Sequence, residues 1–350
     1  MTTLPDTTAP DGPYLLYRGD ALIAEWVDTE TRQLGKTVLM PKNFARLPTF
    51  PSFRPEMVDP KRSFEPPQTV HYTGVSRVTA LSDIHGQYDT ARRLLEVNGV
   101  IDERQHWAYG DGHLVVVGDI FDRGDQVTEL LWLVHNLQIE ALEAGGRVHF
   151  LLGNHETMIL EGDDRYLNQK YRITSGLTGK FYHELYGPET YLGRWLRSLP
   201  LAVQIDETVY IHGGLSREMV RQVSSLERLN TLYHRYLIDA SDMAATLSGS
   251  RRMELMHGRE GPLWYRGYFM RDAFSDRDMD YVLRKIGARR IVVGHTSFTA
   301  INTFYDGRLI AVDSSIKFGS TGELLMVEDG AYYRATLTGE RTPLHLEATK

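Results

Sequence analysis

The chain has 350 residues, 42% of them hydrophobic and 24% charged, a composition typical of a globular protein with a sizeable core. Its formal net charge of −7 argues against a nucleic-acid binder that acts through overall charge, because phosphate contacts need a positive surface. The sequence contains no cysteine, which excludes disulfides, thiolate nucleophiles and cysteine-ligated zinc. It also contains no apolar run long enough to span a membrane.

The N-terminal part of the chain is rich in proline: ten of the 14 prolines lie in residues 1–67. Two apolar runs at 13–17 and 21–27 are separated by a short turn that contains glycine, which predicts a β-hairpin. Prolines then recur every few residues from 41 to 67, which disfavours a helix and predicts an extended segment that wraps the body of the protein.

This change in proline content suggests how the chain is divided. We expect residues 1–70 to form a proline-rich extension with a β-hairpin, and residues 71–345 to form the main domain. Residues 1–6 lack the basic and apolar regions of a signal peptide. This favours a cytoplasmic over a periplasmic location, since a periplasmic protein would need a leader that had been removed.

Residues 78–152 alternate between short apolar runs and helical patterns. The runs at 78–81, 114–117 and 148–152 predict buried strands, and the segments between them predict two helices. This β-α-β-α-β order predicts a mostly parallel sheet. A polar cluster follows each strand, at the edge where open α/β sheets place their sites.

The second half of the chain alternates between helical segments and short strands. Residues 157–199 and 227–257 predict two helical insertions, and 291–293 predicts another buried strand. Three hairpins are also expected, over residues 202–211, 303–311 and 324–337. We expect this half to add a β layer that packs on the first.

Five polar clusters, each after an apolar strand pattern, carry the candidate chemistry. They are Asp83-Ile84-His85, Asp119 to Gly124, Asn154-His155-Glu156, His212-Gly213-Gly214 and Gly294-His295. A single cluster of this kind is a weak signal, because Asp-x-His and Gly-Asp turns are common. Five strand ends that converge on one rim, however, can supply about six ligands for two metal ions.

The residue types and their order indicate how two ions would be shared. Ions ~3.5–4 Å apart need a bridging carboxylate, and Asp119 follows the middle strand of the β-α-β-α-β unit. Asp83 and His85 would complete one site. The other would be completed by Asn154, His212 and His295. Carboxylate, amide and imidazole donors without thiolate suit Mn²⁺, Fe or Zn²⁺ better than Ca²⁺ or Mg²⁺.

The ordered clusters resemble the phosphoprotein phosphatase family of calcineurin-like metallophosphoesterases over roughly residues 76–316. Residues 261–268, Gly-Pro-Leu-Trp-Tyr-Arg-Gly-Tyr, look like the signature of its bacterial, Shewanella-like branch. The resemblance implies an α/β fold: a β-sandwich built on β-α-β-α-β units, flanked by helices, with a helical insertion near the active site. Residues 71–345 would then be the catalytic domain. Ser82 departs from the glycine often found there in the family.

The resemblance implies the same ligands, with Asp119 shared between the two ions. It also implies that His155 is the general acid and that Asp122 orients it through a hydrogen bond. Arg123 and Arg266 would bind the substrate phosphate. Two alternatives stay open: Arg123 forms a structural ion pair with a neighbouring aspartate, and Arg266 is a solvated loop residue.

The activity implied is that of a dinuclear metal-dependent phosphatase, with Mn²⁺ favoured and Fe or Zn²⁺ as alternatives. A hydroxide that bridges the ions would attack a phosphomonoester in line, without a phosphoenzyme. The substrate would be a phosphoprotein, through serine/threonine or tyrosine phosphate, or a small phosphomonoester. A phosphodiesterase or dinucleoside polyphosphate hydrolase on the same metals is the alternative enzyme. A binding protein with a degenerate site is the alternative class, against which the intact ligand set argues. We expect no nucleic-acid partner, and no motif indicates the oligomeric state.

Five tyrosines between residues 166 and 191, and nine histidines outside the motifs, have no assigned chemistry. We expect the tyrosines to pack in the core of the helical insertion. The alternative is that one or two of them form a wall beside the metals and stack on an aromatic leaving group. We interpret the nine histidines, among them His71, His113, His149 and His257, as structural or surface residues.

Overall fold

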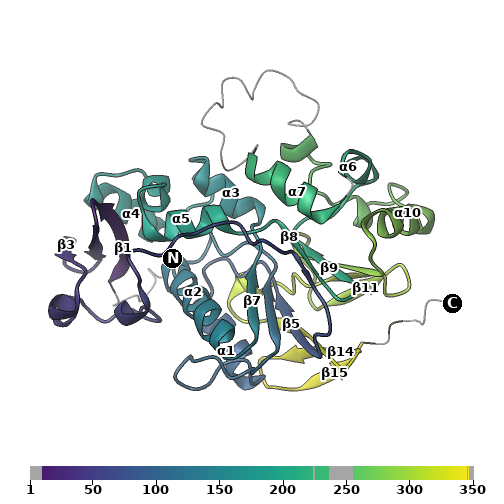
Figure 1. The fold of residues 1–350 in the computed structure, drawn as a ribbon, viewed down its shortest axis with the longest axis horizontal. Coiled ribbons are helices and arrows are strands. Elements are labelled where there is room, and N and C mark those ends of the chain that lie inside the picture. The colour runs from purple at the N-terminus through teal and green to yellow at the C-terminus, as the bar shows by residue number, and fades with distance from the viewer. Residues whose placement is uncertain (1–9, 224, 236–254, 345, 347–350) are drawn as a thin grey trace, which may run out of the picture.

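Two six-stranded sheets that pack face to face form the centre of the computed structural model (Figure 1). The structure describes residues 10–223, 225–235, 255–344 and 346. The space between the sheets is filled by buried aliphatic side chains from both of them, for example Val115 and Leu325 from one sheet and Val203 and Val292 from the other. The α/β sandwich predicted from the sequence is therefore confirmed.

The first sheet contains the predicted β-α-β-α-β unit. Its strands lie in the order β15-β14-β13-β5-β6-β7, and β5, β6 and β7 are parallel to one another. The bounds are β5 (Arg77–Leu81), β6 (His113–Val116), β7 (Arg147–Phe150), β13 (Glu323–Glu328), β14 (Ala331–Thr336) and β15 (Arg341–Pro343). Because β6 is central among the parallel strands, the loop that carries Asp119 leaves from the middle of the sheet edge.

The second sheet has the order β11-β12-β10-β9-β8-β4. Its bounds are β4 (His71–Tyr72), β8 (Ala202–Ile205), β9 (Thr208–Ile211), β10 (Arg290–Val293), β11 (Asn302–Phe304) and β12 (Leu309–Ala311). The expectation that the second half forms a separate layer is partly wrong, because the hairpin of β13 and β14 joins the first sheet through antiparallel pairing of β13 with β5. A hairpin pattern does not say which free edge the hairpin joins.

Helices cover the outer faces of the sandwich. Figure 1 places α1 and α2 beside the first sheet and α6, α7 and α10 beside the second. The α-helices described are α1 (Tyr88–Val97), α2 (Val127–Glu143), α3 (Asn154–Leu160), α4 (Gln169–Thr178), α5 (Tyr191–Ser198), α6 (Arg217–Gln222), α7 (Leu226–Tyr233) and α10 (Asp276–Ile286). Short 3₁₀ turns are η1 (Pro41–Arg46), η2 (Pro55–Met57), η3 (Tyr182–Tyr186), η5 (Gly267–Phe269) and η6 (Ile316–Phe318).

The helical insertion after the third strand is confirmed by α3, α4, η3 and α5. The insertion predicted over 227–257 is confirmed by α7 only for its first part, since residues 236–254 lie outside the described residues. Within the part of the chain that the structure describes, no helix combines the length and the apolar character that crossing a membrane requires.

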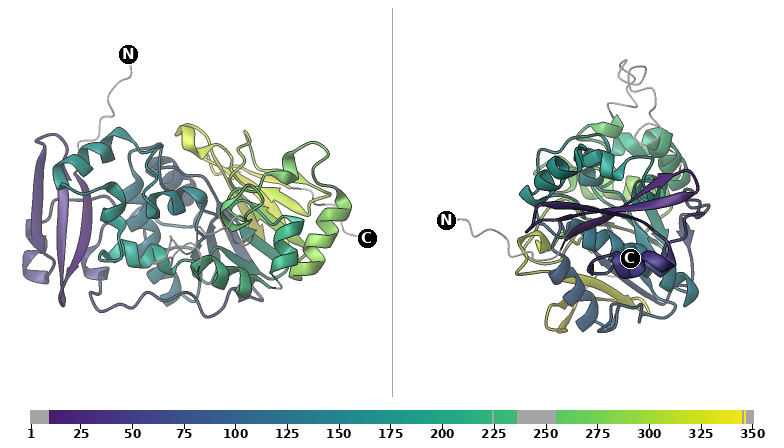
Figure 2. Two further views of the ribbon diagram at one scale, coloured as in Figure 1. Left: turned by 90° about the horizontal axis from the view of Figure 1, so that it is seen from above. Right: turned by 90° about the vertical axis from the view of Figure 1, so that its left-hand side faces the viewer.

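The predicted N-terminal hairpin is present and has a third strand that the sequence did not indicate. β1 (Asp11–Arg18), β2 (Ala21–Asp28) and β3 (Gln33–Val38) form an antiparallel sheet, which lies at one end of the molecule (Figure 2). β3 lacks an apolar pattern because none of its residues is fully buried. The chain then passes through η1 and η2 to β4, which pairs with β8. The division at residue 70 stays a prediction.

Candidate metal and phosphate site

The predicted metal ligands come together at the carboxyl ends of five strands. Asp83 and His85 follow β5, Asp119 follows β6, and Asn154 follows β7. The remaining two ligands, His212 and His295, follow β9 and β10 of the second sheet. All six are at most 6% exposed. Five of them line a cavity of about 290 Å³, and His212 lies behind it, fully buried. The site therefore spans the end of the sandwich.

An unusual backbone conformation turns these side chains toward one another. Six site residues have left-handed backbones, with φ between 47° and 69°: Asp83, His85, Asp119, Asp122, Arg123 and His295. Such a conformation costs roughly 1–3 kcal/mol for a non-glycine residue and is concentrated at functional sites. Here it ends each strand abruptly, so that residues two apart face the same cavity. Gly153 allows the close approach, since a Cβ there would lie 2.2 Å from Asp119 Oδ1.

Glu156 fixes the loops on which the ligands lie, a role that sequence reasoning missed. Its buried carboxylate accepts backbone N–H groups from Gly153 at 2.7 Å, Asp119 at 2.8 Å and Ile120 at 2.7 Å. It thereby joins the end of β6 to the start of α3. The available signal was its place in the Asn-His-Glu triplet, at the third position of a helix, where a carboxylate can cap free N–H groups.

Asp119 is the centre of the site. Its Oδ2 lies 3.3 Å from His212 Nε2, 3.6 Å from His85 Nε2 and 3.9 Å from His155 Nε2. Burial opposes ionisation of this carboxyl, but His212, His155 and His85 outweigh it and hold the pKa of Asp119 well below its usual value. Asp119 also belongs to both groups of potential ligand atoms within 4.8 Å of one another, one with His85 and His155 and one with His212 and His295.

Asp83 lies at the edge of the first group. One oxygen, Oδ2, accepts hydrogen bonds from Ser82 Oγ at 2.6 Å and from the His295 backbone at 2.8 Å. The other, Oδ1, lies 3.9 Å from His85 Nε2. Burial and the nearby Asp313 and Asp119 carboxylates raise the pKa of Asp83 well above its usual value. Ser82, the departure from the family pattern, thus supports a ligand directly.

The residues present fit a pair of divalent cations. Among the described residues, only imidazoles lie within ion-pair distance of the Asp83 and Asp119 carboxylates. His295 Nε2 is buried without a hydrogen-bond partner there, although its ring centroid is 5.0 Å from that of His212. A buried carboxylate pair and an unpartnered imidazole nitrogen are costly unless a cation satisfies them. Oxygen and imidazole donors suit Mn²⁺, Fe or Zn²⁺.

The predicted acid and its partner are in contact. His155 Nδ1 is 2.5 Å from Asp122 Oδ2, and both side chains are buried. Burial opposes protonation of the imidazole, but Asp119 and Asp122 outweigh it and raise the pKa of His155 above its usual value. The bond to Asp122 leaves Nε2 as the nitrogen that faces the cavity.

Three cations surround the cavity, two of them predicted. Arg123 and Arg266 both line it, and both are exposed. Within the described residues Arg123 forms no ion pair with Asp119 or Asp125, so the structural alternative is not realised. Arg266 Nη2 lies 3.4 Å from the His295 carbonyl oxygen. Lys317, which sequence reasoning missed, also lines the cavity and lies 3.6 Å from buried Asp313.

Aromatic residues lie on two sides of the cavity. The Tyr166 ring, 45% exposed, lies 5.3 Å from His155 and 5.6 Å from the Arg123 guanidinium. Trp264 belongs to the 261–268 signature but was not predicted to line the cavity, and its ring lies 5.6 Å from that of His295. The other four tyrosines of the insertion are buried in the core, as expected: Tyr171, Tyr182, Tyr186 and Tyr191. The core interpretation is thus confirmed for four tyrosines, and Tyr166 lies in the cavity wall, where its stacking on a leaving group stays a prediction.

Comparison with known proteins shows the family of this chain. The model of the calcineurin-like phosphoesterase family matches residues 76–297. The crystal structure of a cold-active protein-tyrosine phosphatase from a psychrophilic Shewanella species matches with a TM-score of 0.85 and 38% identity, over 97% of this chain and 100% of that one. Shewanella-like protein phosphatase 1 of Plasmodium berghei is 27% identical, over 63% of this chain and 61% of that protein. Shewanella-like protein phosphatase 2 of Arabidopsis thaliana is 32% identical, over 43% of this chain and 34% of that protein.

The chain therefore belongs to the calcineurin-like phosphoesterases. Within them it is a phosphatase of the Shewanella-like branch of the phosphoprotein phosphatases. The family and the class of enzyme predicted from the motifs are thus confirmed.

Proposed function

We propose that the protein is a dinuclear metal-dependent phosphomonoesterase that acts on phosphoproteins, with phosphotyrosine among its substrates. One observation carries the dinuclear assignment: Asp119 Oδ2 lies within 3.9 Å of three imidazole nitrogens and is common to two groups of ligand atoms. Asp83, His85 and Asp119 would hold one ion. The second would be held by Asp119, Asn154, His212 and His295. Two such ions, when bound, supply an acidified water and positive charge beside the phosphoryl oxygens.

The side chains around the ligands account for the rest of the reaction. Arg123 and Arg266 would bind equatorial phosphoryl oxygens, where negative charge accumulates in the transition state. His155 would donate the Nε2 proton to the leaving oxygen while Asp122 fixes the ring at Nδ1. His155 lies close enough to Asp119 to be a ligand instead. We assign it as the acid because Asp83 supplies the charge that balances the first ion and because the ring of His155 faces Tyr166, toward the open side of the cavity.

Tyr166 supports an aryl leaving group. Its exposed ring lies beside the proposed acid, so a phenol that leaves toward His155 would meet an aromatic face, a favourable contact. The loop that carries Tyr166 is tied to the phosphate-binding turn, because the Arg123 N–H donates to the Tyr166 carbonyl at 3.1 Å. The related Shewanella enzyme, described as a protein-tyrosine phosphatase, supports the same substrate.

A metal-reconstituted activity panel tests this proposal. Chelator-stripped protein would be assayed with Mn²⁺, Zn²⁺, Fe²⁺ and Mg²⁺ on phosphotyrosine and phosphothreonine peptides, p-nitrophenyl phosphate and the corresponding bis-ester. We expect Mn²⁺ to restore turnover of monoesters, fastest on aryl phosphates, with the bis-ester slow. Activity mainly on the bis-ester would favour the phosphodiesterase, and silence with two bound metals would favour a binding protein.

A further inference from the structure

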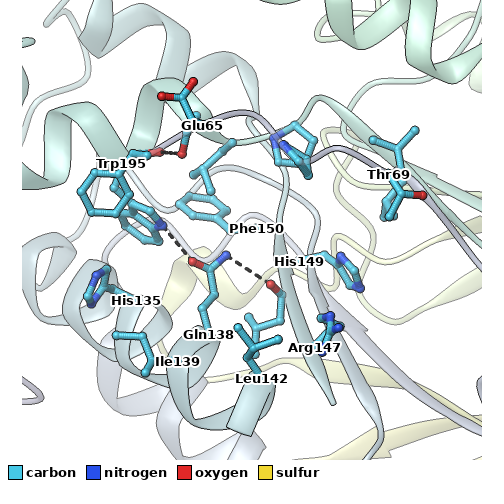
Figure 3. Close-up of a pocket in the computed structure, with 18 of the residues that line it drawn as sticks. Glu65, Thr69, His135, Gln138, Ile139, Leu142, Arg147, His149, Phe150 and Trp195 are labelled. Carbon is cyan, nitrogen blue, oxygen red and sulfur yellow. Dashed lines mark hydrogen bonds between the residues drawn. The ribbon is translucent and has the colours of Figure 1, made fainter. Parts of the chain in front are cut away.

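A second cavity, larger than the metal site, lies on another part of the molecule (Figure 3). It measures about 580 Å³ and is enclosed by α2, β7, the end of α5 and the chain segment 62–70 that leads to β4. This volume is within the range of pockets that bind drug-sized ligands. β7 connects the two sites, since its residues line this cavity and Asn154 and His155 follow it directly.

The floor of this second cavity is aromatic, and the edge of β7 beside it cannot pair fully with an added peptide strand. Phe150 and Trp195, both buried, line the cavity together with Phe64 of the segment 62–70. Gln138 spans the floor: its amide accepts from Trp195 Nε1 at 2.8 Å and donates to the Val148 carbonyl at 3.1 Å (Figure 3). Because Gln138 occupies this carbonyl on the free edge of β7, a peptide cannot add there as a strand with full pairing. The cavity suits a compact ligand with a flat apolar body.

The charged groups that line the second cavity are two arginines and two glutamates. Arg62 and Arg147 are half-buried in its wall, and among the described residues neither has a carboxylate within ion-pair distance. The carboxylates of Glu65 and Glu143 lie on exposed residues of the rim. His135, 1% exposed, also lines the cavity and has a buried Nε2 that lacks a hydrogen-bond partner in the described structure. Arg147 Nη1 donates to the Gly146 carbonyl at 2.7 Å. A half-buried guanidinium that has donors to spare and no carboxylate partner favours an anion.

We propose that this second cavity binds a small organic anion with an aromatic body, such as an aryl carboxylate or sulfonate. The aromatic floor takes the ring system, and Arg147 takes the charge. Neither the metal ligands nor the phosphate-binding arginines of the catalytic cavity take part, so the proposal is independent of the proposed reaction.

The probe for this site is 1-anilinonaphthalene-8-sulfonate, an aromatic anion, titrated by fluorescence into the metal-loaded full chain. We expect saturable binding of one probe per chain. R147M should weaken it about tenfold, the size expected for a lost charge-assisted hydrogen bond, while R147K stays within about twofold. I139W, which fills the cavity, should abolish binding. R271M alters an exposed arginine outside the cavity and should change nothing. The uncharged N-phenyl-1-naphthylamine should bind about tenfold more weakly than the sulfonate.

Non-saturable binding, or saturable binding that both R147M and I139W leave unchanged, would overturn the site. Loss in I139W with none in R147M, or equal affinity for the charged and neutral probes, would overturn the assignment of an anion. If I139W does not fold, the comparison of R147M with R147K still tests whether the charge at position 147 contributes to binding of the probe.

A separate observation concerns how the phosphate-binding turn is held. Lys170 Nζ, on a side chain 3% exposed, donates to the Asp125 carbonyl at 2.7 Å and to Glu129 at 3.0 Å, and lies 3.8 Å from Asp11 of the N-terminal sheet. Next to it, Asn168 Nδ2 donates to the Arg123 carbonyl at 2.8 Å. Two side chains of one segment thus hold the backbone on both sides of Gly124.

We infer that Lys170 is a positioning residue for Arg123 and that Asp11 makes the N-terminal sheet part of this support. The inference rests on the proposed role of Arg123 in binding phosphate. Arg123 and Asp122 have left-handed backbones, which persist only when their surroundings hold them. Without Lys170 the turn relaxes, and the Arg123 guanidinium is no longer held in the position that binds phosphate.

The test is competitive inhibition of the Mn²⁺-loaded enzyme by inorganic phosphate. We expect K170M to raise the phosphate Ki and the KM by about tenfold or less, with a smaller change in kcat. K180M is the matched control, because Lys180 also joins the N-terminal sheet to this region, through Glu25 at 2.7 Å, without touching the turn. Its Ki should be unchanged.

R123M distinguishes a failure of the inference about Lys170 from a failure of the proposed role of Arg123 in binding phosphate. If R123M raises the Ki and K170M does not, Lys170 has a structural role only and the inference is overturned. If R123M leaves the Ki unchanged, the proposed role of Arg123 itself fails.

Discussion

Two buried clusters of charged side chains in this molecule are built in opposite ways. In the first, Asp11 and Glu129 surround Lys170, and Asp11 also accepts hydroxyl donors from Tyr14 at 2.8 Å and Thr174 at 2.5 Å. In the second, the metal site, the Asp83 and Asp119 carboxylates meet only imidazoles within ion-pair distance in the described structure. The first cluster has an ammonium group within ion-pair distance of both carboxylates, whereas in the second no lysine or arginine of the described structure lies that close.

The backbone shows the same difference. The ligands of the metal site have left-handed backbones at Asp83, His85, Asp119 and His295, whereas Asp11, Glu129 and Lys170 have none. Strained backbone persists only where its surroundings hold it, and buried carboxylates need a cation that compensates them. Lys170 is that cation in the first cluster, and we expect bound metal ions to be the cations in the second. The two clusters therefore differ in role: the buried charges of the first stabilise the fold, and we expect those of the second to take part in the reaction.

The largest effect is expected from D119N, which removes the charge shared between the two ligand groups and keeps the side-chain shape. We expect turnover of p-nitrophenyl phosphate to fall roughly a thousandfold or more, since several kcal/mol of transition-state stabilisation is lost. Bound metal should drop below two ions per chain, measured by elemental analysis, while circular dichroism stays unchanged. Activity close to wild type would contradict a central role for Asp119.

H155A separates the acid from the ligands within the same cluster. We expect kcat on a phosphothreonine peptide to fall by about 10²–10⁴-fold. The loss on p-nitrophenyl phosphate should be much smaller, because that leaving group needs little protonation. Metal content should stay at two ions per chain. Full activity on an unactivated alkyl phosphate would show that the acid role is wrong, and loss of one ion would make His155 a ligand.

K170M tests the Lys170 cluster by removing its cation. Breaking a buried pair on one side leaves carboxylates uncompensated, so we expect the free energy of unfolding to fall by about 3–5 kcal/mol in urea denaturation. K180M should cost about 1 kcal/mol or less, because Lys180 is partly exposed and Glu25 keeps Lys36 at 2.7 Å. A similar loss of unfolding free energy in K170M and K180M would contradict the role of Lys170 as the cation of a buried cluster.

The smallest effect on stability is expected from His135, which lies outside both clusters. Burial lowers the pKa of His135 to about 4, below its unfolded value of about 6.5. The unfolded chain therefore binds more protons below pH 6.5, and stability is lost as pH falls through the window from about 6.5 to 4. At pH 5 the loss from this group is about 2 kcal/mol. H135F should flatten the fall in unfolding free energy between pH 7 and 5 by that amount, and an unchanged slope would contradict a neutral buried imidazole.

Much of this arrangement could be predicted from the sequence, because short apolar runs end at polar clusters and parallel strands share an edge. That logic places Asp83, Asp119 and Asn154 together. It does not place Lys317 or Trp264 at the cavity, because their positions depend on loops without a periodic pattern. Strand β3 was missed because its residues are not fully buried. The contact of Asp11 with Lys170 could not be predicted either, because it joins residues far apart in the sequence.

The most direct test of the account is the number of ions that the metal site binds. Chelator-treated protein would be titrated with Mn²⁺ by calorimetry while phosphatase activity is followed in the same samples. We predict two ions per chain in the wild type, with activity that rises as the second ion binds. Binding of one ion or none at full activity would contradict the claim that this cluster is a dinuclear metal centre.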